Sequence, residues 1–273
     1  MIVYLIMLQR SFLKWPGGKY RSVNQLLCLF PKEFGTYYEP FAGSAVVCLN
    51  VKAERKVVSD IEDSLMNAHE KVKTCVGKVI DCLDEFNNSS DAYYDIREEF
   101  NSASDSFSYS DAARFIYLNK CGFNGLYRRN KNGGFNVSFG KRSGNPHKDF
   151  ENLRSCSQLL HGVELMVGGY ESCLSDVAVG DFVYLDPPYV KESGTSFTGY
   201  NSNQFDNSAN RKLSDFCRDL DSSGVLFAVS NSNTKLIREW YDGFHIRELQ
   251  AVRSISREGR SRGRCTELLI TNY

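Results

Sequence analysis

The segment from Val183 to Val190, VYLDPPYV, runs from apolar residues to an aspartate, two consecutive prolines and a tyrosine. A proline has no backbone N–H and fixes its own φ, so two in succession end a β-strand. We therefore predict a buried strand that ends at Asp186 and holds this carboxylate, the carbonyl of Pro187 and the ring of Tyr189 in fixed positions. The alternative is an edge strand that prolines terminate, with an aspartate there by chance.

Strand patterns recur on both sides of this segment, and SAVVCLNVKA (residues 44–53) is interpreted as a helix between two of them. The other predicted strands are TYYEPFAG, RKVVSD, VELMVGG, VLFAVSN and CTELLITNY. Alternating strands and helices predict a mostly parallel α/β sheet. Residues 61 to about 157 break this alternation with polar helical patterns and the loop-rich stretch NGLYRRNKNGGFNVSFG. We therefore predict a discontinuous catalytic domain over residues 1–60 and 162–273, and an inserted domain over residues 61–161.

Charge is unevenly distributed along the 273 residues, although 33 basic and 33 acidic side chains give a formal net charge of zero. Residues 112–148 contain eight Lys or Arg and no Asp or Glu, and RSISREGRSRGR (residues 253–264) is a second basic run. Basic faces on a neutral protein suit a polyanion such as nucleic acid. The alternative is an ordinary solvated surface.

The nine cysteines form no C-x-x-C pair, and the four histidines show no metal-ligand spacing. The start, MIVYLIML, is too short for a secretory leader or a membrane span, and it is interpreted as an edge strand or as residues before a start at Met7. We expect a cytoplasmic protein with reduced thiols, no bound metal and no membrane association.

Two glycine-containing turns favour a nucleotide-like ligand. In FLKWPGGKY (residues 12–20), Gly17 and Gly18 allow a ligand close to the backbone, Lys19 supplies a cation and Trp15 a flat apolar face. A simple turn is the alternative. In EPFAGS (residues 39–44), a glycine lies between a predicted strand and helix, which suits a ligand at a helix N-terminus.

Asp60 follows this turn by about 20 residues, where such folds place an acid on ribose hydroxyls. Capping of the next helix is a second role open to Asp60. A complete G-x-G-x-x-G motif is missing, which argues against a dinucleotide. S-adenosylmethionine has a ribose but no pyrophosphate, so it is the cofactor that these motifs favour.

Residues 186–190, which we call the Asp186 segment, suit the transfer of a methyl group to the exocyclic amine of adenine. The amine is a poor nucleophile because its lone pair is delocalised into the ring. Two acceptors that hold its N–H groups out of the base plane localise the lone pair on the nitrogen. The carboxylate of Asp186 and the carbonyl of Pro187 can be these acceptors. Tyr189 can stack on an extruded base, which contributes roughly 1–3 kcal/mol. Phe197 and Tyr200 are expected to close the pocket. The amine becomes strongly acidic after transfer, so no strong general base is needed.

In this order, the motifs resemble the Dam-type DNA adenine-N6 methyltransferases of bacteria and their phages. The similar stretches include FLKWPGGKY, YYEPFAGS, SDIEDSLMN, LNKCGFNGLYRRNKNGGFNVSFG, YLDPPY, SFTGYNSNQF, SNSNTKLIREWY and RSISREGRSRGRCTELL. The resemblance implies an α/β fold with a Rossmann-like S-adenosylmethionine-dependent methyltransferase core. It also implies an inserted, mainly helical DNA-recognition domain that carries a β-hairpin and acts on double-stranded DNA, within GATC.

The resemblance also implies roles for single residues. Asp186 and Tyr189 match the catalytic pair, to which we add Pro187. The residues assigned to the cofactor site are Trp15, Gly17, Gly18, Lys19, Glu39, Phe41, Asp60, Tyr170 and Asp186. The residues assigned to DNA binding are Lys14 at a target base, Phe123 inserted beside the flipped adenine, Asn124 at the orphaned thymine, Arg128 at a guanine edge, and Leu126, Ser138 and Arg142.

Three positions depart from the family pattern. Ala45 stands where glycine is frequent, Ser138 where members that recognise GATC often have proline, and Arg142 where an aromatic residue occurs. The last two affect the outer recognition bases and not the chemistry.

A target base must leave the duplex, which costs a few kcal/mol, and Phe123 has the size to fill the gap. We interpret Arg129, Lys131, Lys141 and Lys148 as phosphate contacts. The alternative places Phe123 in a core and the arginines in solvent.

Alternative functions are methylation of another DNA sequence, of RNA adenine or of a glutamine amide, and DNA binding without catalysis. We expect a monomer in solution.

Overall fold

The computed structural model describes residues 8–103, 107–190, 205–252 and 264–273 and contains a seven-stranded sheet in the order β3-β2-β1-β4-β5-β7-β6. β1 pairs in parallel with β2 and β4, and β4 pairs in parallel with β5. β7 is antiparallel to both of its neighbours. The strands are β1 (Tyr37–Glu39), β2 (Lys56–Asp60), β3 (Val163–Val167), β4 (Phe182–Leu185), β5 (Leu226–Ser232), β6 (His245–Val252) and β7 (Arg264–Thr271).

The order 3-2-1-4-5 is that of doubly wound nucleotide-binding sheets, which confirms the predicted α/β fold. The α-helices are α1 (Val23–Leu29), α2 (Asp63–Glu85), α3 (Ser90–Ser102), α4 (Tyr109–Cys121), α5 (Phe150–Leu160), α6 (Tyr170–Cys173), α7 (Asn207–Ser222) and α8 (Lys235–Trp240). Two short 3₁₀ helices are η1 (Lys19–Arg21) and η2 (Phe123–Gly125).

The chain forms two compact units. The helical unit contains Met1–Cys28, Gly43–Lys52 and Glu62–Val167, and the sheet unit contains Leu29–Ala42, Ala53–Ile61 and Gly168–Tyr273. The predicted domain division at residues 60/61 and 161/162 stays a proposal.

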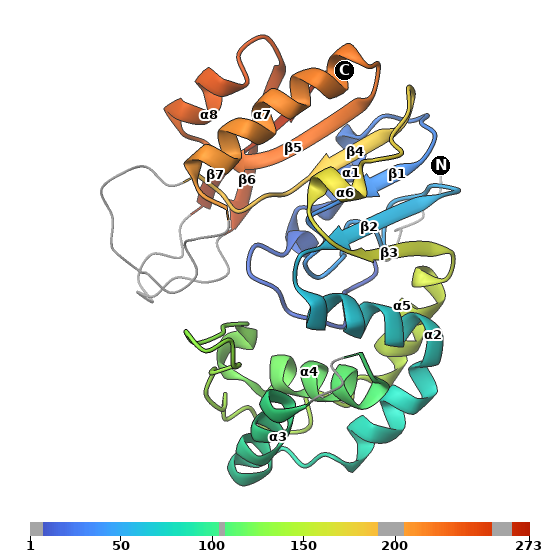
Figure 1. Cartoon of the computed structure of the whole chain (residues 1–273), viewed down its shortest axis with the longest axis vertical. Coiled ribbons are helices and arrows are strands. Elements are labelled where there is room, and N and C mark those ends of the chain that lie inside the picture. Colours follow the sequence, from blue (N-terminus) through green and yellow to red (C-terminus); the bar gives the residue numbers. More distant parts are fainter. Residues whose placement is uncertain (1–7, 104–106, 191–204, 253–263) are drawn as a thin grey trace, which may run out of the picture. The chain divides into compact units, whose positions relative to one another are not determined.

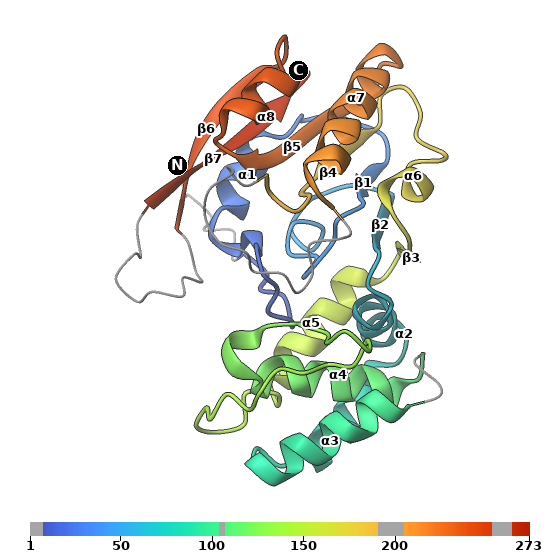
Figure 2. The same cartoon turned by 60° about the vertical axis from the view of Figure 1, so that its left-hand side comes forward.

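In the helical unit, serine caps begin two of the helices. The hydroxyl of Ser89 accepts a hydrogen bond from the backbone N–H of Ala92 at the start of α3, and Ser108 does the same for Asp111 of α4. α4 is buried along most of its length. Figure 2 shows α3 and α4 beside the loop segment that follows α4. The helical pattern predicted for this part of the sequence is confirmed.

The segment after α4 folds back on itself, as the NGGF turn predicts. Isolated bridges join Gly122 to Phe139 and Arg129 to Phe135. The N–H of Asn130 donates to the carbonyl of Gly134 at 2.8 Å, which closes the turn. We call residues 122–142 the DNA-contact segment, because it contains most of the predicted DNA-binding residues.

The predicted helix over residues 44–53 is wrong. These residues form turns, with backbone bonds from Leu49 to Ala45 and from Val51 to Val47. Ala45 has a φ of +53°, which a right-handed helix does not contain. The side chain of Asn50 also donates to the backbone carbonyls of Val46 and of a distant residue, Gln9, and so competes with helical hydrogen bonding.

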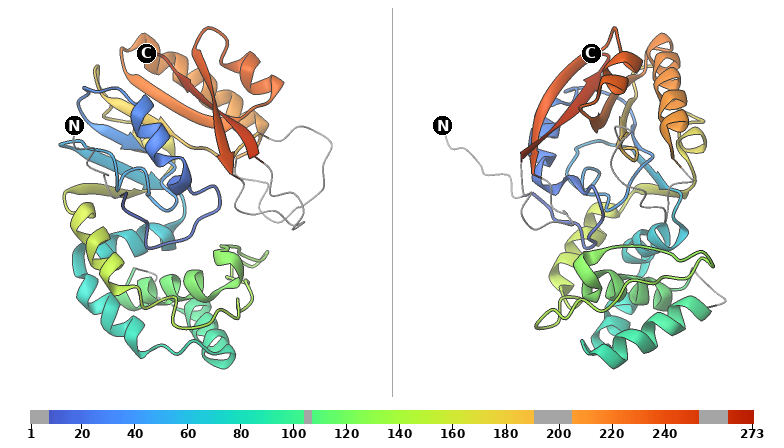
Figure 3. Two further views of the ribbon diagram at one scale, coloured as in Figure 1. Left: turned by 180° about the vertical axis from the view of Figure 1, so that it is seen from behind. Right: turned by 90° about the vertical axis from the view of Figure 1, so that its left-hand side faces the viewer.

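In the sheet unit, α7 runs beside β5 (Figure 1), and β6 and β7 form a long antiparallel pair (Figure 3). Asp181, next to the start of β4, accepts hydrogen bonds from the backbone N–H groups of Thr36 at 2.7 Å and Ala178 at 3.0 Å. This side chain therefore fixes where β1 and β4 begin.

No helix in the described part of the chain is long and apolar enough to cross a lipid bilayer. Three predictions lie outside the described residues: the edge strand at residues 1–7, the pocket-closing Phe197 and Tyr200, and nearly all of the second basic run.

Candidate active site

Three carboxylates lie at the carboxyl ends of neighbouring strands in the sheet unit. Glu39 is the last residue of β1, Asp60 is the last residue of β2, and Asp186 directly follows β4. Because these strands are adjacent and parallel, the three residues share one edge of the sheet, with strands about 4.8 Å apart. The strand order reverses between β1 and β4, which is where such sheets bind ligands.

Glu39 is almost fully buried, at 2% exposure, and accepts a hydrogen bond from the hydroxyl of Tyr37 at 2.8 Å. Tyr184, on β4, is also buried, and its hydroxyl lies 2.9 Å from the hydroxyl of Ser230. Burial, followed by the charges of Asp186, Glu39 and Glu267, raises the pKa of Tyr184 well above its usual range. Burial is the largest of these causes, and the three carboxylates add to it because they make the ionised phenol less favourable.

The Asp186 segment is held by side chains from other elements of its unit. β4 ends at Leu185, one residue before the predicted end at Asp186. The side-chain oxygen of Asn231 accepts from the N–H of Val190 at 3.2 Å, and the hydroxyl of Tyr189 donates to the carboxylate of Glu267 at 2.9 Å. Pro187 is buried and Asp186 is half-buried.

Two aromatic residues assigned to the cofactor site come together. The ring of Phe41 stacks on that of Tyr170 with centroids 6.0 Å apart and planes at 27°. Phe205 contacts Phe41 edge-on at 5.3 Å. The three rings form an aromatic cluster that begins two residues after the end of β1. Phe205 lies in the stretch SFTGYNSNQF, which resembles the family, but the sequence indicated no role for it.

The remaining predicted cofactor residues belong to the helical unit. Gly17, with a φ of +79°, and Gly18 form a tight turn in which the N–H of Gly18 donates to the carbonyl of Trp15 at 3.0 Å. The ammonium of Lys19 donates to the carbonyl of Gly17 at 3.0 Å. This geometry is compatible both with a ligand-binding loop and with the simple turn.

The Trp15 ring has structural contacts of its own. It stacks on Tyr127 with centroids 5.3 Å apart and planes at 25°. Gly43 packs against its edge so closely that a Cβ there would lie 2.6 Å from Cδ1 of Trp15. Position 43 therefore requires a glycine for two reasons: a side chain there would clash with Trp15, and the φ of Gly43 is +47°.

His69 supports the same glycine turn and was missed by the sequence analysis. Its Nε2 lies 2.9 Å from the carbonyl oxygen of Gly43. Complete burial lowers the pKa of His69 to about 4, so the ring is neutral at pH 7 and its Nε2–H donates. No spacing in the sequence connects these two residues, which are far apart along the chain.

Two details of the sequence analysis change. Ala45, where the family frequently has glycine, adopts a left-handed φ of +53°, which explains that preference for glycine. The N-cap position of α2 is occupied by Glu62, so the interpretation of Asp60 as a helix cap is wrong. The backbone carbonyl of Asp60 instead accepts from the N–H of Gly168 at 3.0 Å.

All predicted DNA-binding residues lie in the helical unit. Phe123 is 51% exposed, so its interpretation as a core residue is wrong. Asn124 is also exposed and has a φ of +56°, which asparagine tolerates better than most residues. The chain therefore projects these two side chains from a sharp turn. Leu126 is half-buried, and Ser138 and Arg142 are exposed.

Lys14 packs beneath this turn. A Cβ on Gly125 would lie 2.5 Å from Cδ of Lys14, so the lysine stem fills the space beside that glycine. The side chain of Asn119 bonds to both the N–H and the carbonyl of Lys14, at 2.9 and 2.7 Å. Burial, with smaller contributions from Arg142 and Lys120, lowers the pKa of Lys14 to about 8, and its buried Nζ has no hydrogen-bond partner among the described residues.

Arg128 is exposed and is oriented by the opposite side of its hairpin. Its Nε donates to the side-chain oxygen of Asn136 at 2.7 Å, and a terminal nitrogen donates to the Asn136 carbonyl at 3.2 Å. The guanidinium is thus pre-oriented at the surface of the DNA-contact segment.

Two predicted phosphate contacts are corrected. Arg129 forms ion pairs with Glu62 and, at 2.9 Å, with Asp63 at the start of α2. Lys148 forms an ion pair with Asp84 at 2.9 Å. Both cations therefore have partners within the helical unit, and the sequence could not indicate this because each partner lies more than 60 residues earlier. Lys131 and Lys141 are exposed.

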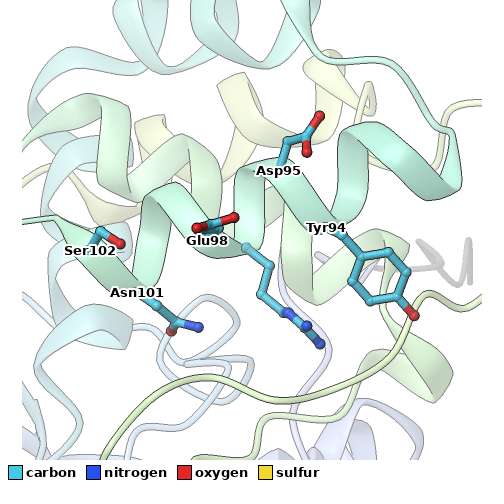
Figure 4. Close-up of a pocket in the computed structure, with 6 residues that line it drawn as sticks. Tyr94, Asp95, Glu98, Asn101 and Ser102 are labelled. Atoms are coloured by element: carbon cyan, nitrogen blue, oxygen red, sulfur yellow. The ribbon is translucent and has the colours of Figure 1, made fainter.

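The helical unit also contains two hollows. One, of about 350 Å³, lies on a single face of α3 (Figure 4) and includes none of the predicted site residues. Its lining residues are Tyr94, Asp95, Arg97, Glu98, Asn101 and Ser102. The other, of about 310 Å³, adjoins the ion pair of Arg129 and Asp63.

Comparisons with known proteins found one matching family model and several similar proteins. Residues 15–255 match the family model described as D12 class N6 adenine-specific DNA methyltransferase. The chain is 34% identical to Type II methyltransferase M1.LlaDCHI of Lactococcus lactis subsp. cremoris, covering 97% of this chain and 95% of that protein. It is 36% identical to Type II methyltransferase M.MjaIII of Methanocaldococcus jannaschii (97% and 99%) and 33% identical to DNA adenine methylase of Haemophilus influenzae (95% and 92%).

Proposed function

The chain belongs to the D12 class of N6 adenine-specific DNA methyltransferases, and we propose that it methylates adenine N6 within GATC sites of double-stranded DNA. In this proposal the methyl group comes from S-adenosylmethionine and the target adenine is rotated out of the duplex. The observation that carries the proposal is the group of three carboxylates at neighbouring strand ends, beside a proline-stiffened segment.

The residues at this edge of the sheet fit S-adenosylmethionine chemically. Asp60 offers acceptors for ribose hydroxyls, as the acid at this position does in related sheets. The negative potential of Glu39 and Asp186 suits a ligand with a sulfonium and an ammonium group. Phe41 and Tyr170 offer the flat surface for adenine. For Trp15, Gly17, Gly18 and Lys19, which belong to the helical unit, the proposed cofactor role rests on the sequence motif and the family resemblance. When bound, the cofactor supplies an electrophilic methyl group on a positively charged sulfur.

The Asp186 segment then acts on the target amine. The carboxylate of Asp186 and the carbonyl of Pro187 each accept one N–H of the exocyclic amine, which localises the nitrogen lone pair. The ring of Tyr189 stacks on the extruded base. Since the nitrogen is strongly acidic after transfer, the proton leaves to solvent without a strong base. Stiff residues suit this role, because a small displacement of either acceptor lowers the transfer rate.

The DNA-contact segment supplies recognition in this proposal. Phe123 fills the space that the extruded base leaves, and Asn124 bonds to the orphaned thymine. Arg128 presents paired donors to guanine O6 and N7. Lys14 contacts a target base, and Leu126, Ser138 and Arg142 lie near the outer bases. The exposure of Phe123 and the bonds that pre-orient Arg128 support these roles.

We also place the enzyme in the cytoplasm of a bacterium or of a phage-infected host cell, where its DNA substrate lies, and we expect a monomer in solution. We propose residues 61–161 as the inserted DNA-recognition domain.

The test is transfer of a labelled methyl group from S-adenosylmethionine to four substrates: a GATC duplex, the same duplex already methylated at adenine N6, a scrambled duplex, and duplex RNA. We expect label only in the first. Equal labelling of the first two would contradict adenine N6 as the target. Labelling of the scrambled duplex or of RNA would favour those alternative substrates. DNA binding without label on any substrate would favour a non-catalytic protein.

A further inference from the structure

The segments SNSNTKLIREWY and RCTELL resemble family stretches but received no role from the sequence. β5 ends at Ser232, and the register of the antiparallel pair places Ser232 opposite Glu267 of β7. Because β7 runs opposite to the parallel strands, its early residues lie at the edge where those strands end. Glu267 is thereby brought to the Asp186 segment.

Glu267 contacts the proposed catalytic tyrosine directly. The hydroxyl of Tyr189 donates to Oε2 of Glu267 at 2.9 Å. Burial, followed by the charges of Asp186 and Glu267, raises the pKa of Tyr189 well above its usual range. The phenol therefore keeps its proton at neutral pH, and it remains a donor to this carboxylate.

A second set of bonds fixes the backbone on both sides of the tyrosine. Asn231, which is 0% exposed, accepts from the N–H of Val190, and its side-chain NH₂ donates to the side chain of Asn210 at 3.1 Å. Asn210 in turn donates to the carbonyl of Pro188 at 3.2 Å, and the hydroxyl of Ser232 donates to the carbonyl of Val190 at 2.7 Å. Side chains of β5 and α7 thus fix the backbone on both sides of Tyr189. The hydrogen bond between the Tyr189 hydroxyl and Glu267 restrains rotation of the ring.

We propose that Glu267 is a positioning residue for methyl transfer, which orients the ring of Tyr189 so that the extruded adenine stacks with its amine at Asp186. A ring without an anchored hydroxyl still offers a stacking face, but it samples a wider range of χ2 angles. Glu267 touches neither the base nor the cofactor in this role, which rests on the proposed function. It acts through Tyr189.

The variant Glu267→Leu removes the acceptor, whereas Glu267→Gln keeps it. The matched control is Glu248→Leu. Glu248 lies on β6, the strand that pairs with β7, and its half-exposed carboxylate forms an ion pair with Arg238 of α8. The measurements are the single-turnover rate of methyl transfer to a GATC duplex, KM for DNA, and the emission of 2-aminopurine at the target position. Thermal unfolding confirms that each variant is folded.

We expect Glu267→Leu to lower the single-turnover rate about tenfold, the size of a lost hydrogen bond to a charged group. KM for DNA stays within about twofold, because only the reacting geometry changes. The 2-aminopurine emission rises as stacking on Tyr189 loosens. Glu267→Gln stays within about threefold of the wild-type rate, and Glu248→Leu is unchanged.

Tyr189→Phe separates positioning from general stabilisation. If Glu267 acts through the phenol, Tyr189→Phe lowers the rate about as much as Glu267→Leu, and the double variant is no slower than either. Wild-type rates and emission in Glu267→Leu, or multiplied losses in the double variant, would overturn the inference while leaving the proposed function intact. An inactive wild type would instead contradict the proposed function.

Discussion

The Asp186 segment (residues 186–190) and the DNA-contact segment (residues 122–142) differ in how exposed their predicted functional side chains are. The Asp186 segment is bonded to side chains of other elements: Asn210 on α7, Asn231 on β5 and Glu267 on β7. The DNA-contact segment is anchored through Arg129 to Asp63 of α2 and through Phe135 to Asn101 of α3. The guanidinium of Arg128, in contrast, bonds within the segment, to Asn136. Its Phe123 and Arg128 are exposed.

This difference follows the two tasks. In the proposed mechanism, methyl transfer requires the same geometry at every turnover, so its two acceptors need a rigid scaffold. Recognition requires side chains that project into the grooves of DNA, so they must remain exposed until DNA binds. A substitution in the Asp186 segment should therefore change rate, and one in the DNA-contact segment should change substrate choice.

The largest expected effect is at Asp186. Asp186→Ala should lower methyl transfer at least about a hundredfold, because one of the two acceptors of the amine is lost. DNA affinity should stay within about twofold. Labelled methyl incorporation and a DNA-binding titration measure the two quantities. Asp176→Ala, which removes an exposed aspartate of the same unit, is the control and should leave both unchanged.

Arg128→Ala should relax discrimination at one base pair by about 1–3 kcal/mol, since paired donors to guanine are lost. The ratio of kcat/KM for the cognate duplex to that for each singly substituted duplex measures this effect. Lys131→Ala, which removes an exposed cation of the same segment, should preserve the ratio. A uniform loss of affinity for every sequence after Arg128→Ala would make Arg128 a phosphate contact instead.

Lys14 should make DNA affinity depend on pH. Its pKa is lowered to about 8, so its charge is largely lost between pH 7 and pH 9, and affinity should fall about threefold to tenfold over that range. Binding titrations at constant salt measure it. Lys14→Met should remove this dependence, whereas Lys131→Met should retain it. Because burial depresses this pKa below its unfolded value, Lys14 also lowers folding stability below pH 8, and stability should rise toward pH 10.5.

Phe123→Ala should have the smallest effect on the protein itself. The ring is 51% exposed, so the free energy of unfolding should change by less than about 0.5 kcal/mol. Extrusion of 2-aminopurine at the target position should nevertheless weaken. Chemical denaturation and fluorescence test the two parts. Tyr109→Ala, at another exposed aromatic residue of the helical unit, should leave extrusion unchanged. A marked loss of stability in Phe123→Ala would indicate a packing role.

Much of the sheet unit was predictable because its information is local. Apolar runs that end in Glu39, Asp60 and Asp186 indicate both the strands and their polar ends. Since parallel strands place their carboxyl ends at one edge, the meeting of these acids follows from the fold.

The supporting residues could not be predicted in the same way. His69 bonds to Gly43, Glu267 bonds to Tyr189, and Arg129 pairs with Glu62, and each of these pairs is separated by 26 residues or more. No periodicity connects such partners. The error over residues 44–53 has a related cause, since the two hydrogen bonds between Asn50 and Gln9 depend on tertiary structure. The polar residues at the end of VLFAVSN were the one sign in the sequence that Asn231 bonds to a segment outside its own strand.

The most direct test of the account is a crystal structure of the protein with a GATC duplex and a non-reactive analogue of S-adenosylmethionine. We predict that a carboxylate oxygen of Asp186 and the carbonyl oxygen of Pro187 each lie about 3 Å from N6 of an extruded adenine. An Asp186 side chain that points away from the nucleotide would contradict the account.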